Sequence, residues 1–151
     1  MKRYEWSRLN KQQVGAYAEY FVKMELTMYG FQVYQTEVDD RGIDFVARFD
    51  DRDFIEVQVK STRTNGYIFA RKENFPLRAN MFMAVVLFEE GAAPPIYLIP
   101  ALAWGRPTDL LVSRDYPGLK SKPEWGINIS GKNMSELQTY HLDDTLNALC
   151  K

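Results

Sequence analysis

Polar side chains recur at every second position in one short segment of the chain. In Phe54-Ile55-Glu56-Val57-Gln58-Val59-Lys60, the residues Glu56, Gln58 and Lys60 alternate with aliphatic residues. Because successive side chains of a strand point to opposite faces, the polar row would stand on one face and the aliphatic residues on the core face. Side-chain oxygens in such a row can hold a divalent cation beside a phosphate, and the lysine would lie next to the same phosphate. The same alternation is also the commonest pattern of a half-exposed antiparallel strand, so the row alone leaves both interpretations open.

A further carboxylate, Asp44, lies in the preceding extended segment. The alternation predicts strands over 43–49 and 54–60, joined as a hairpin around the acidic turn 50–53. In such a hairpin Asp44 and Lys60 share a face only if paired positions sum to an even number. We therefore expect an odd-length turn or a bulge near 50–53. Alternatively, Asp44 only closes the turn that follows Gly42.

The chemistry that suits these groups is phosphodiester hydrolysis. That reaction needs charge neutralisation on a pentacoordinate phosphate and a positioned, acidified water, both of which Mg²⁺ can provide. Mg²⁺ keeps several of its waters, so one aspartate, a second side-chain oxygen and a backbone carbonyl are enough protein ligands. A lysine two residues beyond the second ligand would stabilise the charge of the transition state.

The elements that must position these residues can be read from periodicity and turn signals. An apolar stripe with a period near 3.6 predicts a first helix over 12–29, which ends at Gly30. The run 81–88 is nearly all apolar, as expected of a strand buried on both faces. The other expected elements are strands at 31–36, 67–70, 96–99 and 126–129, a short helix started by Pro76 within 71–80, and a last helix over 135–149, with 100–132 otherwise irregular.

In order and spacing, these residues resemble the PD-(D/E)XK nuclease superfamily, which includes archaeal Holliday junction resolvases and Mrr-type restriction enzymes. The resemblance rests on Glu19 in the first helix, Asp44 in Gly42-Ile43-Asp44, and the triplet Gln58-Val59-Lys60, and it covers about residues 12–100. It implies an α/β fold with a restriction-endonuclease-like core, in which helices flank a mixed β-sheet in the order αβββαβ.

Gln58 stands where Asp or Glu is usual in that superfamily, and this Gln-X-Lys form is similar to the one in Mrr-type and resolvase-like members. The resemblance implies that Asp44 and Gln58 bind Mg²⁺ or Mn²⁺ directly, with Glu19 as a direct or water-mediated partner. Lys60 would position water and stabilise charge, and Glu56 would supplement the metal ligands. The plain alternative for Glu19 is a solvated residue on an amphipathic helix.

Basic residues that follow the candidate site are candidates for contact with phosphates: Lys60, Arg63, Arg71, Lys72 and Arg78. Scattered basic residues are also typical of an ordinary solvated surface. The partner that this chemistry implies is nucleic acid, specifically DNA. Cleavage of both strands of a duplex would favour a homodimer.

Composition limits the number of domains, the cellular compartment and the kinds of site that the chain can have. The chain has 151 residues and a net charge of -1, which fits one domain over 1–151 and no strongly basic surface. The family resemblance implies that 101–151 is a variable part of that domain. One cysteine, Cys150, and no export signal near Met1 favour a reducing, cytoplasmic compartment. The longest apolar run is far shorter than the roughly 20 residues that span a bilayer, so we expect no membrane association. With His141 as the single histidine and one cysteine, the sequence argues against a zinc site or a Cys/His nucleophile pair.

Two classes of function remain open at this point. The first is a Mg²⁺-dependent endonuclease that acts on DNA. The second is a catalytically inactive module that keeps the nuclease fold to bind nucleic acid or a protein, for which Gln58 is the best argument. An RNA-directed nuclease would share the same site.

Overall fold

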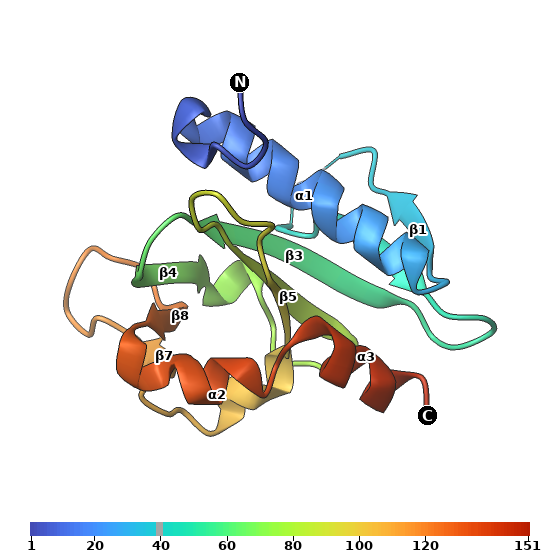
Figure 1. The fold of residues 1–151 in the computed structure, drawn as a ribbon. Helices are drawn as coiled ribbons and strands as arrows, with labels where there is room; N and C mark the ends of the chain where they lie inside the picture. The colour runs from blue at the N-terminus through green and yellow to red at the C-terminus, as the bar shows by residue number, and fades with distance from the viewer. Residues whose placement is uncertain (39–40) are drawn as a thin grey trace.

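Two β-sheets and three α-helices make up the fold in a computed structural model, which describes residues 1–38 and 41–151 (Figure 1). The larger sheet has the order β1-β2-β3-β5-β6, formed by Gln32–Gln35, Phe45–Arg48, Ile55–Thr62, Met81–Leu87 and Ile96–Pro100. The smaller has the order β4-β8-β7, formed by Gly66–Arg71, Glu124–Ile129 and Leu111–Arg114. The helices are α1, α2 and α3, over Lys11–Met28, Met134–Gln138 and Leu142–Leu149.

Helix α1 covers one face of the larger sheet (Figure 1). It begins with a capping box, in which the Asn10 side chain accepts from the backbone N–H of Gln13 and the Gln13 side chain accepts from that of Asn10. Its buried residues, Val14, Ala18, Val22 and Leu26, recur at every fourth position and pack against Phe45 and Val57 of the sheet. The helix predicted over 12–29 is therefore confirmed to within one residue at each end.

The opposite face of the larger sheet is covered by the smaller sheet. Met81, Met83 and Val85 of β5 pack there in a second core with Trp104 and Ile127. Their neighbours Phe82, Ala84 and Val86 belong to the core under α1. The prediction that 81–88 forms a strand buried on both faces is thus confirmed over Met81–Leu87.

The hairpin of β2 and β3 has the parity that the sequence required. Phe45 pairs with Val57, Val46 with Glu56 and Ala47 with Ile55, so paired positions sum to an even number. The number of residues between the last paired positions, Ala47 and Ile55, is odd, as predicted. β3 then pairs in parallel with β5, which makes the sheet mixed.

The C-terminal helix predicted over 135–149 is wrong as a single element. The backbone breaks between α2 and α3, where the C=O of Tyr140 accepts from the N–H of Leu98 at 2.8 Å and His141 bridges to Tyr97. The segment therefore pairs with the edge strand β6 in place of continuing the helix. His141 then starts α3 by accepting from the N–H of Asp143.

The connection between β3 and β5 also differs from the αβββαβ order. The strand β4 and a 3₁₀ turn at Lys72–Asn74 occupy the place of the helix, and Pro76 follows that turn. The region 100–132 is more regular than expected, because it supplies both β7 and β8, which pair with each other and with β4. Asp39 and Asp40, which the sequence assigned to a loop, lie outside the described residues.

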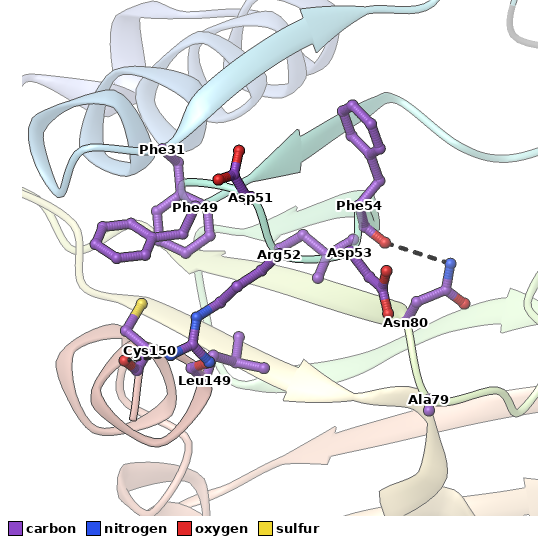
Figure 2. A pocket seen from close by; sticks show the side chains of 11 residues that line it. Phe31, Phe49, Asp51, Arg52, Asp53, Phe54, Ala79, Asn80, Leu149 and Cys150 are labelled. Carbon is purple, nitrogen blue, oxygen red and sulfur yellow. Dashed lines mark hydrogen bonds between the residues drawn. The ribbon is translucent and has the colours of Figure 1, made fainter.

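The turn between β2 and β3 is hydrogen-bonded to the end of the C-terminal helix, α3. Arg52 donates to the carbonyl oxygens of Leu149 and Cys150, at 2.8 and 2.9 Å, at the end of α3. Figure 2 shows this arginine in a pocket whose walls include Phe31, Phe49 and Phe54. Among the described residues, no helix is long and apolar enough to cross a membrane.

Candidate active site

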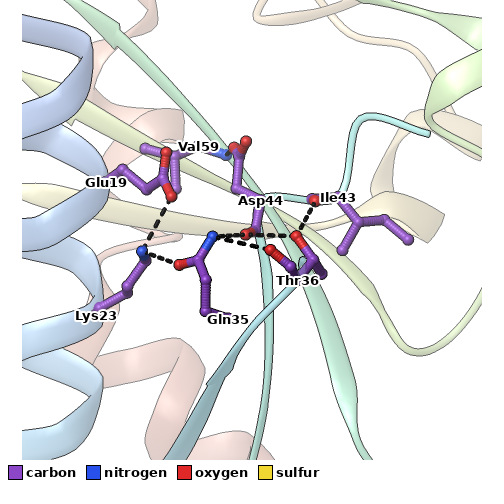
Figure 3. Close-up of polar contacts among 7 residues, drawn as sticks. All are labelled: Glu19, Lys23, Gln35, Thr36, Ile43, Asp44 and Val59. Carbon is purple, nitrogen blue, oxygen red and sulfur yellow. Dashed lines mark hydrogen bonds and ion pairs between the residues drawn. The ribbon is translucent and has the colours of Figure 1, made fainter. Parts of the chain in front are cut away.

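Asp44 is held against β3 by two hydrogen bonds, although it precedes the first residue of β2. Its backbone N–H donates to the carbonyl oxygen of Val57 at 2.9 Å. Its carboxylate Oδ2 accepts from the backbone N–H of Val59 at 2.6 Å (Figure 3). A hydrogen bond to an ionised oxygen is shorter and stronger than a neutral one. Asp44 is therefore fixed at the level of β3 where Gln58 and Lys60 flank Val59.

The strand register decides which side chains of β2 and β3 share a face. Val46 is paired with Glu56, so it shares a face with Glu56, Gln58 and Lys60. α1 packs on the other face, the one that carries Val57. Asp44 precedes these pairs, and its N–H bonds to the same Val57 that pairs with Phe45, so the regular alternation does not extend to Asp44.

Gln58 has its side-chain amide buried beside the loop that precedes Asp44. The residue is 9% exposed, and its Oε1 is buried with no hydrogen-bond partner among the described residues. Its Nε2 lies 3.3 Å from the position that a Cβ would take on Gly42, whose φ is +73°. Leaving a buried acceptor unsatisfied costs about 1–3 kcal/mol, so such an atom calls for a physical explanation. A ligand that accepts electron density from this oxygen would supply one.

Glu19 is connected to Asp44 through two other side chains. Its carboxylate pairs with Lys23 at 3.0 Å, and Lys23 donates to Oε1 of Gln35. The Nε2 of Gln35 lies 3.3 Å from the backbone oxygen of Asp44, which Thr36 also approaches at 3.3 Å (Figure 3). The predicted helical glutamate is thus near the site but is engaged by a lysine one turn away.

Glu56 is also engaged by a cation. It forms an ion pair with Arg78, and both side chains border a hollow with Arg41, Glu73 and Asn74. Among the residues that the structure describes, no group of three or more His, Cys, Asp and Glu side chains comes together in an arrangement that could hold a metal ion. The four predicted metal ligands therefore include two, Glu19 and Glu56, that are ion-paired.

Asp44 and Gln58 still fit a hard divalent cation. Both offer oxygen, the donor that Mg²⁺ prefers, and Mg²⁺ needs few protein ligands because it retains several waters. The unpartnered oxygen of Gln58 is the observation of this structure that favours such a group. The pair supplies one negative charge, so the site would depend on nearby carboxylates or on the phosphate for the remaining neutralisation.

The five predicted nucleic-acid contacts are spread over several elements, and three of them pair with carboxylates. Arg71 lies 3.8 Å from Glu73, and Arg78 pairs with Glu56. Lys72 pairs with Asp115 at 2.7 Å and stands over the ring of Trp125. Lys60 and Arg63 line a hollow between α1 and the end of β3.

The side chains that surround these residues were not among those predicted from the sequence. The pair of Glu19 and Lys23 has the i, i+4 spacing of a helical ion pair, so this contact was open to prediction. Gln35 and Thr36 carry no comparable signal, because their contact with Asp44 depends on the pairing of β1 with β2.

No protein-family model and no curated protein matches this sequence. Several solved structures share the fold, among them two that cover most of this chain. One is Hjc, a Holliday junction resolvase from the archaeal hyperthermophile Archaeoglobus fulgidus, with a TM-score of 0.50 and 17% identity over 85% of this chain and 89% of that one. The other is a bacterial homing endonuclease, I-Ssp6803I, with a TM-score of 0.55 and 14% identity over 93% of this chain and 91% of that one.

These similarities confirm the predicted fold class, a mixed α/β fold of the restriction-endonuclease-like kind. At such low identity they bear on the fold alone. The closer resemblance to Mrr-type members, which rests on Gln58, stays a prediction.

Proposed function

We propose that this protein is a metal-dependent endonuclease that hydrolyses phosphodiester bonds in DNA. The observation that carries the proposal is the buried, unpartnered Oε1 of Gln58, on the strand that also holds the carboxylate of Asp44 and bears Lys60. The fold that presents them is shared with a Holliday junction resolvase and a homing endonuclease.

Each side chain has a role that follows from its chemistry. Mg²⁺, when bound, would neutralise charge on the phosphate and lower the pKa of a coordinated water. Asp44 and Gln58 would hold it, and Glu19 would join them directly or through water. The ammonium of Lys60 would stabilise the negative charge that develops on the phosphate oxygens and position the attacking water.

The hydrogen bond from Val59 fixes the orientation of the Asp44 carboxylate. A fixed ligand binds a metal more tightly than a mobile one, because less rotamer freedom is lost on binding. Asp44→Ala would lose this bond together with the ligand. Asp44→Asn keeps an acceptor for the Val59 N–H and removes the charge, so it is the sharper variant.

The proposal is tested by incubating purified protein with Mg²⁺ or Mn²⁺ and with duplex, branched and single-stranded DNA. We expect cleavage of at least one DNA form, and loss of at least 100-fold in rate in Asp44→Asn and in Lys60→Met. Asp109→Asn and Lys132→Met, at exposed positions, serve as matched controls and should cleave as the wild type does. Cleavage that survives in both site variants, or no cleavage of any DNA form, would overturn the proposal.

A second candidate function is a catalytically inactive module that binds nucleic acid or a protein. It is favoured by the two ion pairs that occupy Glu19 and Glu56 and by the lack of an acidic cluster among the described residues. Calorimetric titration with Mn²⁺ separates the two. An endonuclease should bind Mn²⁺ with an affinity that falls in Asp44→Asn, whereas an inactive module should show no such binding. RNA substrates in the same cleavage assay test the RNA-directed alternative.

A further inference from the structure

A hollow adjoins the candidate active site between α1 and the end of β3. Its walls are formed by Lys11, Val14, Gly15, Val59, Lys60, Ser61, Thr62 and Arg63, and its volume is about 470 Å³. We call it the α1–β3 hollow. Val59 and Lys60 connect it with the site, because the N–H of Val59 binds the Asp44 carboxylate.

The charge of the α1–β3 hollow is one-sided. Lys11, Lys60 and Arg63 line it, and no Asp or Glu of the described residues does. Lys11 and Arg63 form no ion pair with any described carboxylate. This distinguishes them from Arg71, Lys72 and Arg78, which are all paired. The hollow therefore presents a local positive charge on a chain whose net charge is -1.

Arg63 is held in place across the hollow. Its guanidinium donates to the carbonyl oxygen of Leu9, just before the start of α1. An arginine has five N–H donors in a rigid fork, so one bond to the backbone orients the group and leaves other donors to bind oxygen. The hydroxyl of Ser61 adds a neutral donor to the same wall.

Gly15 keeps the floor of the hollow open. It lies within α1, where glycine is a poor helix former, and a Cβ built on it meets no atom within 4 Å. Packing in the folded chain therefore does not require glycine here. A side chain at this position would extend from the helix into space that the hollow occupies.

We propose that the α1–β3 hollow binds a backbone phosphate of the nucleic-acid strand next to the phosphate that the site would cleave. A phosphodiester oxyanion is bound by cations and hydroxyl donors that surround an open space. Lys60 borders both the α1–β3 hollow and the candidate active site. This inference rests on the proposed function for the neighbouring phosphate. It concerns which contacts with the nucleic-acid strand position the substrate.

The test measures binding without cleavage, in EDTA, by fluorescence anisotropy of labelled duplex and single-stranded oligonucleotides over a series of salt concentrations. Lys11→Gln should weaken binding several-fold and lower the slope of log K against log salt by about 1, the value expected for one lost phosphate contact. Gly15→Gln should weaken binding while thermal stability is kept or raised. Lys132→Gln, the charge control, should bind as the wild type does.

Inorganic phosphate provides the second arm, since it carries the same oxyanion without a strand. Oligonucleotide binding by Lys11→Gln and Gly15→Gln that equals the wild type would overturn the inference. A second contradicting result is that inorganic phosphate stabilises the wild type but not Lys11→Gln, while both proteins bind oligonucleotides equally. That result would also overturn the inference, because the hollow would then bind a free anion and not a strand. Wild-type protein that binds through Lys11 but cleaves nothing would contradict the proposed function and leave this inference standing.

Discussion

The carboxylate of Asp44 accepts a structural hydrogen bond and is also a proposed metal ligand. One of its oxygens accepts from Val59, and this bond extends the contact of the two strands beyond the first residue of β2. The sequence could predict the parity of the β2–β3 hairpin, because parity depends only on alternation and turn length. It could not predict the bond to Val59, which depends on how the chain enters the strand.

Gln58 provides the most direct test of a metal site at the scale of one residue. In Gln58→Glu a carboxylate replaces the buried amide, and without a cation we expect a loss of about 1–3 kcal/mol in the free energy of unfolding. A bound divalent cation should restore it, since a ligand at 100 times its Kd stabilises by about 2.7 kcal/mol. Thermal unfolding in EDTA and in Mn²⁺ measures both effects. Gln12→Glu, at an exposed position of α1, is the control.

An equal response to Mn²⁺ in Gln58→Glu and in the wild type would contradict a metal site at this position. The comparison does not depend on any substrate.

Gly42 is expected to be essential for the placement of Gln58. An added Cβ would lie 3.2 Å from the Cβ of Asn74 and 3.3 Å from the Gln58 amide, at a φ of +73°. Gly42→Ala should lose about 2 kcal/mol of stability or more, combining a left-handed conformation, which costs about 1–2 kcal/mol, with crowding. Urea unfolding measures the loss.

Gly91→Ala is the matched control for that substitution. Its φ is +83°, but the added Cβ would meet no atom within 4 Å. It should therefore show the conformational cost alone. Equal losses in the two variants would mean that Gly42 does not position the amide.

At the scale of elements, the pairing of β4 with β8 brings together a hydrogen-bonded pair of side chains. The O–H of Tyr67 donates to the carboxylate of Glu124, which is buried. Burial of the phenol, and then this bond, raise the pKa of Tyr67 well above its ordinary value of 10. The folded protein therefore keeps this proton at a pH where the unfolded chain has lost it.

That shift has a defined sign in the stability of the protein. The contribution of Tyr67 should be fully present below about pH 10 and should be lost as the pH rises toward the raised pKa. The difference in unfolding free energy between the wild type and Tyr67→Phe should be about 1–3 kcal/mol at neutral pH and should shrink above pH 10. Tyr20→Phe, at an exposed position, should show no such trend. A difference that is constant up to pH 12 would contradict the assignment.

The elements that the sequence predicted best are those whose pattern is local. α1 has a capping box and an apolar residue at every fourth position, and β5 has an unbroken apolar run. The break between α2 and α3 was not predictable in this way, because it depends on Tyr140 and His141 pairing with β6. β7 is four residues long and pairs only with β8, so it shows too few alternations to be recognised.

At the scale of the whole molecule, one chain provides one candidate site. Cutting both strands of a duplex at one place therefore favours two copies, and we expect a homodimer under conditions where double-strand breaks form. Light scattering after gel filtration, together with a plasmid assay that separates nicked from linear product, checks this. A monomer that linearises plasmid without accumulating nicked circles would contradict it.

The loop that joins β2 to β3 can vary in length more freely than the pairing of the two strands. A one-residue shift of that pairing would exchange the two sides of one strand relative to the other. The apolar residues that pack under α1 oppose that exchange. We therefore expect a single insertion or deletion in 49–54 to change the shape of the loop and to leave the pairing of β2 with β3 unchanged.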